Sequence, residues 1–306
     1  MIKNNLIKLT CIINVKNGEK YIYKAINSVI NQTIPVKIVV IDNHSTDNSS
    51  NIIKSFSNVQ YFKTPYSCSL GEARNYSLTK VSSEYIAWLD CDDLWENNFA
   101  EKSVELLDKN PEIGFVSSEC ADIDENDNYL SIKKESNNSL HAAIIKKGRT
   151  LEQYFYNLDG PWSSYVFRSL YVKMTSGFAL ELTYAEDLDF ILSVYKNCNY
   201  RSLHTTEALC KYRYHLEQQT NKIPLYRHYL EKINVLHKFK QEISYIKYIN
   251  IIMYYKFFYY RNLLYFNKSF NIFLKCLFCA MYPVNTINIL KNKLGAISRK
   301  LCQTKI

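Results

Sequence analysis

The sequence Tyr85-Ile86-Ala87-Trp88-Leu89-Asp90-Cys91-Asp92-Asp93 places three carboxylates within four residues, directly after an apolar run. The apolar run predicts a buried strand that ends at the first of these carboxylates. Carboxylates packed so closely repel one another, and a hard divalent cation compensates such a cluster. The alternative is a solvated turn in which Asp caps a following helix. The residues of the turn alone leave both interpretations open.

Strand-like and helix-like segments alternate on both sides of this stretch. The expected strands are 6–15, 36–41, 59–62, 85–89 and 113–117, and the expected helices are 18–31, a segment after Asp47, 71–79 and 99–107. A continuous β-branched run such as 36–41 is typical of a strand that is covered on both faces. The alternation predicts βαβ units, and therefore an α/β fold with a mostly parallel sheet flanked by helices.

The pattern is less regular in the second half of the chain. Residues 126–149 are mostly polar, and we expect a long loop or irregular insert there. Residues 170–174 and 186–195 have helical character, and 202–214 predicts a hairpin or paired strands.

Charge is distributed unevenly along the 306 residues, whose net charge is +9. Residues 225–306 hold 14 of the 38 basic side chains and only 2 of the 29 acidic ones. This region is helix-compatible, with breaks near 266–269 and Pro283, and it is rich in Tyr, Phe, Ile and Lys. We therefore expect a first domain at 1–224 and a basic, aromatic-rich helical region at 225–306. Packing on a core and contact with anionic lipid are both compatible with that composition.

Several features of the sequence limit where the protein can be located and which partners it can bind. No run of 18 uncharged apolar residues occurs, so we expect no spanning helix. The apolar run 6–15 contains Lys8 and is too short and polar for a signal peptide. Nine Cys without framework spacing suit a reducing cytosol, and Cys276-x-x-Cys279 lacks the second ligand pair of a zinc site. We expect a cytoplasmic protein, with a peripheral position on the inner face of the plasma membrane as the alternative. Positive charge spread among apolar residues argues against nucleic-acid binding.

Two further acidic features fall at the ends of predicted elements. Asp42 ends the strand 36–41, and ligands of an open α/β sheet bind beyond the carboxyl ends of its strands. A carboxylate there could accept hydrogen bonds from a base or ribose. Glu186-Asp187-Leu188-Asp189 opens an amphipathic segment. A carboxylate at such a helix start could act as a general base, or could simply complement the helix dipole.

Taken in order, these segments resemble the inverting glycosyltransferases of family 2, which have the GT-A fold. The matching pieces are Asn17-Gly18-Glu19-Lys20-Tyr21-Ile22, Ser28-Val29-Ile30-Asn31-Gln32-Thr33, Asp42 with Ser45-Thr46-Asp47, Gly71-Glu72-Ala73-Arg74-Asn75, Glu84 to Asp93, Glu186-Asp187, and Tyr212-Arg213-Tyr214-His215. The resemblance covers about residues 7–220. It implies a donor half at about 1–120 and an acceptor half at about 121–224. Each motif is weak alone, but seven in the right order favour the cation site over a solvated turn.

The resemblance implies a role for individual residues. Asp187 would be the catalytic base that deprotonates an acceptor hydroxyl, and Asp92 would ligate Mn²⁺ or Mg²⁺. His215 would approach the diphosphate or ligate the same metal. The nucleotide-sugar donor would be bound by Asn17, Asp42, Arg74, Asp90 and Arg213.

The acceptor side and the nucleotide are less closely specified. Glu186 and Trp162 would lie on the acceptor side, where Trp162 could stack on a sugar, although a core Trp is an equal interpretation. Where the family usually has Pro-x-Tyr-Asn, this chain has Asn14-Val15-Lys16-Asn17, so Lys16 replaces the aromatic that lies against the base. Asn43 and His44 replace the usual second Asp and the usual Gly. A UDP-sugar is the donor class that the resemblance implies.

The expected activity is transfer of a sugar from a nucleotide-sugar to a hydroxyl of a saccharide or lipid-linked saccharide, with inversion. The resemblance places it in cell-surface polysaccharide or lipopolysaccharide synthesis. A sugar nucleotidyltransferase is one alternative, but it would want a Gly-rich phosphate loop, and Gly18 is the only glycine before Gly71. A non-catalytic nucleotide-sugar-binding protein is another, and the carboxylates at 90, 92 and 187 argue against it.

Overall fold

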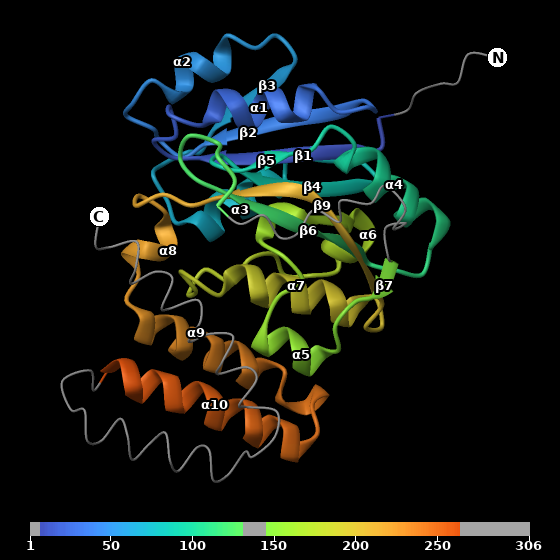
Figure 1. Ribbon diagram of the computed structural model, residues 1–306, viewed down its shortest axis with the longest axis vertical. Coiled ribbons are helices and arrows are strands. Elements are labelled where there is room, and N and C mark those ends of the chain that lie inside the picture. The colour runs from blue at the N-terminus through green and yellow to red at the C-terminus, as the bar shows by residue number, and fades with distance from the viewer. Residues whose placement is uncertain (1–6, 131–144, 264–306) are drawn as a thin grey trace. The chain divides into compact units, whose positions relative to one another are not determined.

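The computed structural model describes residues 7–130 and 145–263 (Figure 1). The chain divides into two compact units, Met1–Lys222 and Ile223–Ile306. Each unit has its own set of packed elements and is described by itself.

The first unit is built around a nine-stranded sheet (Figure 1). Its strands are β1 (Leu9–Val15), β2 (Val36–Asp42), β3 (Val59–Lys63), β4 (Tyr85–Asp90), β5 (Leu94–Trp95), β6 (Phe115–Ile123), β7 (Ile145–Lys147), β8 (Tyr165–Arg168) and β9 (Ser202–Arg213). The order across the sheet is β3-β2-β1-β4-β8-β6-β9-β5, and β7 pairs with β9. Strands β3, β2, β1 and β4 run parallel, so their carboxyl ends meet at one edge. Only β8 runs antiparallel to both of its neighbours on that path, β4 and β6.

Helices flank this sheet, as the alternating pattern predicts. They are α1 (Ile22–Ile30), α2 (Ser49–Lys54), α3 (Leu70–Leu78), α4 (Phe99–Lys109), α5 (Leu151–Tyr156), α6 (Ser169–Lys173), α7 (Glu186–Asn197) and α8 (Gln219–Lys222), with a 3₁₀ turn η1 (Trp162–Ser164). Helix α1 shows why they pack: its buried residues Ile22, Ala25, Ile26 and Val29 recur at helical spacing and form one apolar face. Strand β1 is covered on both faces, because Leu9 to Ile13 are all buried.

The structure confirms the mixed α/β fold and changes three expectations about the second half. Residues 202–213 form one long strand and no hairpin, because β9 pairs along its length with β6 and at its two ends with β7 and β5. Strand β8 was not predicted, since four residues are too few to show a period. The polar segment 126–149 is not wholly irregular, because it contains β7. Residues 131–144 lie outside the described part.

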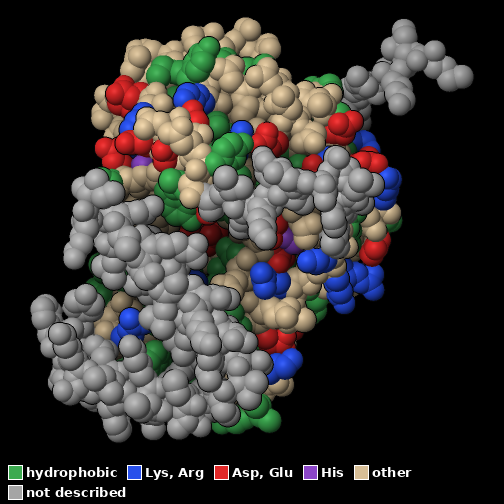
Figure 2. Space-filling view, in the orientation of Figure 1, with side chains coloured by type: hydrophobic (Ala, Val, Ile, Leu, Met, Phe, Trp, Pro, Cys, Tyr) green, Lys and Arg blue, Asp and Glu red, His purple; other side chains and the backbone are tan. Residues whose placement is uncertain are grey.

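Strand β7 lies at an edge of the sheet, where unpaired backbone groups could recruit another chain. Its residues Ile145, Lys146 and Lys147 are exposed. Charged side chains on an edge strand discourage such pairing. Figure 2 shows basic side chains gathered on this side of the molecule, near the position that β7 has in Figure 1.

The second unit begins with two helices, α9 (Leu225–Lys238) and α10 (Tyr245–Leu263), joined through a short 3₁₀ turn η2 (Lys240–Glu242). They pack against each other, and the rings of Tyr229 and Phe258 stack with centroids 5.3 Å apart. Within 7–130 and 145–263, no helix is long and apolar enough to cross a membrane. The breaks predicted near 266–269 and at Pro283, and the Cys276-x-x-Cys279 pair, lie outside the described residues.

Candidate functional site

The carboxyl edge of the parallel strands gathers the acidic features that the sequence singles out. Asn14 is in register with Asp90 across β1 and β4, and Val15 is in register with Asp42 across β1 and β2. The ends of three adjacent strands therefore lie side by side. In an open α/β sheet this edge is where ligands bind.

The turn that follows β4 is stabilised by the side chain of Asp93, which is 1% exposed. Its Oδ2 accepts a hydrogen bond from the Ser163 hydroxyl at 2.6 Å, and its Oδ1 accepts the backbone N–H of Arg213 at 2.9 Å. The Ser163 oxygen in turn accepts the backbone N–H of Asp90 at 3.0 Å. Burial, together with the charges of Asp92 and Asp90, raises the pKa of Asp93 well above its ordinary value. Asp93 therefore shapes the turn and does not face a ligand.

Asp90 lies in contact with a buried arginine. Nη2 of Arg74 is 3.4 Å from Oδ1 of Asp90, and Nη1 of Arg74 is 3.0 Å from Oε1 of Glu186. Burial raises the pKa of Asp90 to about 6; Arg74 acts to lower it, whereas the charges of Asp92 and Asp187 raise it further. The Asp92 and Asp187 carboxylates are thus close enough to Asp90 to influence its pKa.

Arg74 is placed by the start of α3 and by aromatic rings. A capping box begins this helix, in which the Ser69 hydroxyl accepts the Glu72 N–H and the Glu72 carboxylate accepts the Ser69 N–H. The Arg74 guanidinium carbon lies 4.7 Å from the ring centroid of Trp162 and 5.5 Å from that of Phe178. These contacts fix the guanidinium between Asp90 and Glu186.

Glu186 and Asp187 open α7, as the sequence predicts. Glu186 is buried at 5% exposure, whereas Asp187 is half-buried. The Asp187 Oδ1 accepts the backbone N–H of Leu188 at 2.6 Å. The N-terminus of a helix stabilises a negative charge, so this position favours the ionised form of Asp187. The carboxylate can accept a proton from a group that approaches on its exposed side.

Asp92 pairs with His215 across the site. The Asp92 Oδ2 and His215 Nε2 atoms are 2.9 Å apart, and their side chains are 23% and 9% exposed. The His215 ring lies 4.9 Å from the ring of Tyr21, centroid to centroid. A carboxylate oxygen beside an imidazole nitrogen is a donor pair that suits Mn²⁺ and other divalent metals. In the described part of the chain no group of three or more His, Cys, Asp or Glu is arranged to hold a metal.

The family resemblance implies that Arg213 binds the donor, but in the structure its side chain is buried against the backbone of the acidic turn. It is fully buried at the end of β9. Its Nε donates to the backbone carbonyl of Asp92 at 2.7 Å, and its Nη1 donates to the carbonyl of Asp124 at 3.0 Å. The guanidinium therefore contacts backbone of the acidic turn and of the turn that follows β6.

Asp42 and Asn17 also make internal bonds at this edge. Asp42 is fully buried, with Oδ1 accepting the Ser45 N–H at 2.8 Å and Oδ2 accepting the Tyr61 hydroxyl at 2.7 Å. Asn17 has φ 56°, and its Oδ1 accepts the Thr46 N–H at 2.8 Å. Asn17 thus joins the loop after β1 to the loop after β2, whereas Asp42 bonds within its own loop and to β3. Their role toward the donor stays a prediction.

Two substitutions relative to the family pattern are accommodated locally. His44, which replaces a usual Gly, adopts the left-handed φ of 58°, and its Nε2 lies 2.9 Å from the Thr64 carbonyl oxygen. Lys16 is exposed and its Nζ lies 3.0 Å from the Ser67 hydroxyl.

Gly18 is required sterically, because a Cβ there would lie 2.8 Å from Val15 Cγ2 and 3.1 Å from Cys91 Sγ.

Trp162 is 4% exposed and packs in a cluster of rings that includes Trp88 and Phe167. Its burial favours the interpretation as a core residue over stacking on a sugar. The sequence pattern assigns no role to its neighbour Ser163, whose hydroxyl bonds to both Asp93 and Asp90 in the structure. Nothing in the local sequence indicates that this hydroxyl bonds to residues 70 and 73 positions earlier.

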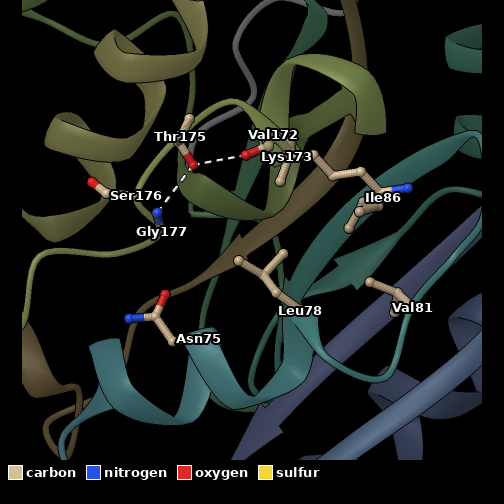
Figure 3. A pocket seen from close by; sticks show the side chains of 9 residues that line it. All are labelled: Asn75, Leu78, Val81, Ile86, Val172, Lys173, Thr175, Ser176 and Gly177. Atoms are coloured by element: carbon tan, nitrogen blue, oxygen red, sulfur yellow. Dashed lines mark hydrogen bonds between the residues drawn. The ribbon is translucent and has the colours of Figure 1, made fainter.

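A separate hollow of about 320 Å³ lies between α3 and the loop after α6 (Figure 3). Its lining includes Asn75, Leu78, Ile86 and Gly177, and none of the carboxylates described above. The Thr175 hydroxyl shapes the loop, donating to the Val172 carbonyl at 2.8 Å and accepting the Gly177 N–H at 3.1 Å (Figure 3). Ile86 is four residues before Asp90 on β4, so the hollow is roughly 13 Å from the acidic turn along the strand.

A mixed sheet flanked by helices, with an acidic turn at its carboxyl edge, defines the GT-A class of nucleotide-sugar transferase folds. The sequence profile of Glycosyl transferase family 2 matches residues 10–167. The match covers more than half of the chain, and the chain therefore belongs to this family.

Curated relatives are also glycosyltransferases. Glycosyltransferase GlyA of Streptococcus pneumoniae is 36% identical over 98 residues, which are 31% of this chain and 14% of that protein. An uncharacterized glycosyltransferase of Haemophilus influenzae is 28% identical over 250 residues, 76% of this chain and 72% of that protein. The chain thus spans only a small part of the first relative.

Solved structures show the same fold at low sequence identity. S. aureus TarS in complex with UDP-GlcNAc superimposes with a TM-score of 0.65 at 18% identity, over 86% of this chain and 74% of that one. The mannosyltransferase PcManGT of Pyrobaculum calidifontis, in complex with GDP-Man and Mn²⁺, gives a TM-score of 0.59 at 14% identity, over 95% of this chain and 80% of that one. A divalent cation is thus found within this fold class.

Proposed function

We propose that the protein transfers a sugar from a nucleotide-sugar, in the first place a UDP-sugar, to a hydroxyl of a saccharide or lipid-linked saccharide with inversion. The observation that carries this proposal is the grouping of Asp90, the Asp92–His215 pair and Asp187 at one edge of the sheet. Family membership and the likeness to TarS in its UDP-GlcNAc complex support the donor class. Synthesis of cell-surface polysaccharide or lipopolysaccharide is the pathway class that we propose.

Asp187 is the group that would take the acceptor proton. It is half-buried in the first turn of α7, where the helix dipole favours a negative charge, and it remains partly accessible. Removal of the proton by Asp187 lets the acceptor oxygen attack the anomeric carbon as the diphosphate leaves from the opposite side. A single displacement of this kind inverts the anomeric configuration.

Arg74 and Glu186 would hold Asp187, the proposed base, in a fixed position relative to Asp90 on the donor side of the site. The Arg74 guanidinium is 4% exposed, and it joins Asp90, on the donor side, to Glu186, the residue before the base. A buried arginine with two carboxylate partners resists displacement, because separating any pair leaves an uncompensated buried charge. We therefore assign Arg74 to holding the site together as well as to the donor.

Asp92 and His215 are the residues that would hold a divalent cation. Their donor atoms are adjacent, and Nδ1 of His215 has no hydrogen-bond partner within the described residues, so the ring is not fixed by a second bond. A cation bound there would neutralise the negative charge that develops on the leaving diphosphate. The carboxylate of Asp92 would exchange its bond to His215 for the metal.

The test is a panel of nucleotide-sugars offered to the full chain with Mn²⁺, with release of the free nucleoside diphosphate as the readout. We expect slow hydrolysis of at least one UDP-sugar, stopped by chelation. Release of pyrophosphate from a nucleoside triphosphate and a sugar phosphate would instead identify a nucleotidyltransferase. Binding of UDP-sugars without turnover, even with acceptor saccharides present, would identify a non-catalytic binding protein.

We also propose peripheral contact of the second unit with anionic membrane. Residues 225–263 hold seven Lys and Arg against two Glu, and Tyr245 and Ile246 are 73% and 74% exposed at the start of α10. Aromatic and apolar side chains beside lysines suit the headgroup layer of an anionic bilayer. Flotation with phosphatidylglycerol vesicles should carry the full chain, and a Tyr245→Ser/Ile246→Ser variant should float less. Equal flotation with phosphatidylcholine vesicles would contradict an electrostatic contribution.

A further inference from the structure

Arg213 holds two successive residues of the acidic turn at once. Its backbone N–H donates to Asp93 at 2.9 Å, and its Nε donates to the Asp92 carbonyl at 2.7 Å. The second bond has a charged donor, and such bonds are about twice as strong as neutral ones. The orientation of the Asp92 peptide is therefore tied directly to the Arg213 side chain.

The other side of the guanidinium is fixed by the turn after β6. Its Nη1 donates to the Asp124 carbonyl at 3.0 Å and pairs with Asp127 Oδ1 at 2.6 Å. The Asp124 carboxylate in turn accepts the N–H groups of Asn126 and Asn128 at 2.8 and 2.9 Å. These bonds make the turn compact, so it presents one carbonyl acceptor and one ion-pair partner to Arg213.

The same turn is joined to the beginning of α1. Asp127 forms an ion pair with Lys24, and Glu125 forms one with Lys20 at 2.6 Å. Asp127 therefore bonds both to the buried Arg213 and to a lysine of α1. Glu125, two residues earlier in the same turn, pairs instead with Lys20.

Burial removes Arg213 from direct contact with a ligand. The residue is fully buried, and its guanidinium carbon lies 4.8 Å from the ring centroid of Tyr21. Its Nη2 atom has no contact with solvent and no hydrogen-bond partner within the described residues. A diphosphate could reach this guanidinium only if the surrounding groups moved first.

We propose that Arg213, held by Asp127, is a positioning residue that orients Asp92 to receive the cation and does not itself bind the diphosphate. As far as it concerns the cation, this inference rests on the proposed function. Residues that orient a metal ligand indirectly affect metal affinity by roughly 10–100-fold when they are changed. The same geometry predicts that the acidic turn loosens when the pair is broken, whether or not a cation is bound.

The first measurement is amide hydrogen exchange on the metal-free full chain. We expect Asp127→Asn and Arg213→Lys to speed exchange in residues 90–95 by about tenfold, while strand 36–42 is unchanged, because the lost bonds are local. Glu125→Gln is the matched control, since it makes the same change of charge in the same turn without touching Arg213. Unchanged exchange at 90–95 in Asp127→Asn would overturn the inference.

The second measurement is calorimetry of UDP binding with and without Mn²⁺. We expect Asp127→Asn to leave metal-free UDP affinity unchanged and to weaken Mn²⁺ binding to the UDP complex about tenfold. A parallel loss of metal-free UDP affinity in Arg213→Lys would show direct contact with the diphosphate and overturn the inference. If Arg213→Lys fails to fold, Asp127→Asn decides, because the Asp127 side chain is 33% exposed.

The two measurements separate this inference from the proposed function. If the unaltered chain binds no UDP, the proposed function fails, while exchange at 90–95 still decides whether Arg213 positions the turn. If the unaltered chain transfers sugar but exchange is the same in all variants, the inference fails alone.

Discussion

The two ends of strand β4 carry opposite electrostatic arrangements. At its beginning, Tyr85 donates to Asp108 at 2.5 Å, and Asp108 also bonds Lys8 at 2.8 Å. Burial acts to raise the pKa of Asp108, but the hydrogen bonds from Lys8 and Tyr85 outweigh it and lower that pKa. At its end, burial raises the pKa of Asp90 to about 6, with two further carboxylates adding to the effect.

The difference indicates which end serves stability and which serves function. Around Asp108 each charge has an opposite partner, so the charges stabilise the fold. Around Asp90, the like charges of Asp92 and Asp187 raise its pKa, and its ion-pair partner Arg74 also pairs with Glu186. Perturbed carboxylates of this kind concentrate at functional sites. Variants at the two ends should therefore affect different quantities.

The largest effect is expected for Asp187→Asn, which removes the proposed base. A positioned base contributes ~10²–10⁴-fold, so we expect kcat to fall by about that factor while the affinity for UDP changes little. The measurement is steady-state transfer together with calorimetry of UDP binding. Glu181→Gln, at an exposed position before α7, is the control and should retain activity. Equal loss of turnover and of donor affinity would contradict the assignment of the base.

Asp92→Asn should come next, because it removes the proposed oxygen ligand while keeping the shape of the turn. We expect the enhancement of UDP binding by Mn²⁺ to fall by at least about tenfold. A titration of Mn²⁺ into the UDP complex, followed by calorimetry, measures it. Metal-dependent UDP binding of unchanged strength in this variant would show that the ligand lies elsewhere.

Some residues of the candidate site can be predicted from the sequence, and others cannot. Asp90, Asp92 and Asp187 could be named in advance because strand ends and helix starts are visible as apolar periodicity followed by carboxylates. The alternation of strands and helices predicted an α/β fold with a mostly parallel sheet, and the resemblance of the ordered motifs implied the GT-A fold. The burial of Arg213 against the backbone of the acidic turn could not be predicted. An arginine that packs inside the protein and an arginine that binds a phosphate look the same in the sequence. The same holds for Ser163 and Asp127, whose partners lie far away in the chain.

At the opposite end of β4, Asp108→Asn should cost stability and leave transfer intact. We expect about 1 kcal/mol at pH 7, because Asn keeps an oxygen acceptor for Tyr85 but removes the charge that strengthens its hydrogen bonds with Tyr85 and Lys8. Because the folded-state pKa of Asp108 is lowered, its contribution is present above roughly pH 4 and is lost as the pH falls through the folded value. Urea unfolding at pH 7 and at about pH 3 measures this. A difference between the two proteins that persists undiminished at the lower pH would rule out the ionised form as its source.

The smallest effect is expected for Glu84→Gln, at the same end. Its carboxylate is 46% exposed and lies 3.8 Å from both Lys8 and Arg168. Exposed pairs at such distances contribute little, and we expect less than about 0.5 kcal/mol. Thermal unfolding against Asp108→Asn gives the comparison. A loss as large as that of Asp108→Asn would mean that Glu84, and not Tyr85, is the main partner in this cluster.

The pairing of the acidic turn with the last strand of its unit has a consequence for the time course of synthesis. Asp93 and Arg213 are 120 residues apart, and β5, directly after the turn, pairs only with β9 among the described strands. A ribosome that adds about 5–20 residues per second needs roughly 6–24 s to cover that distance. During this interval the nascent chain exposes three adjacent carboxylates with neither Arg213 nor His215 yet made. The acidic turn can therefore form its contacts with Arg213 and His215 only after the end of β9 has left the ribosome.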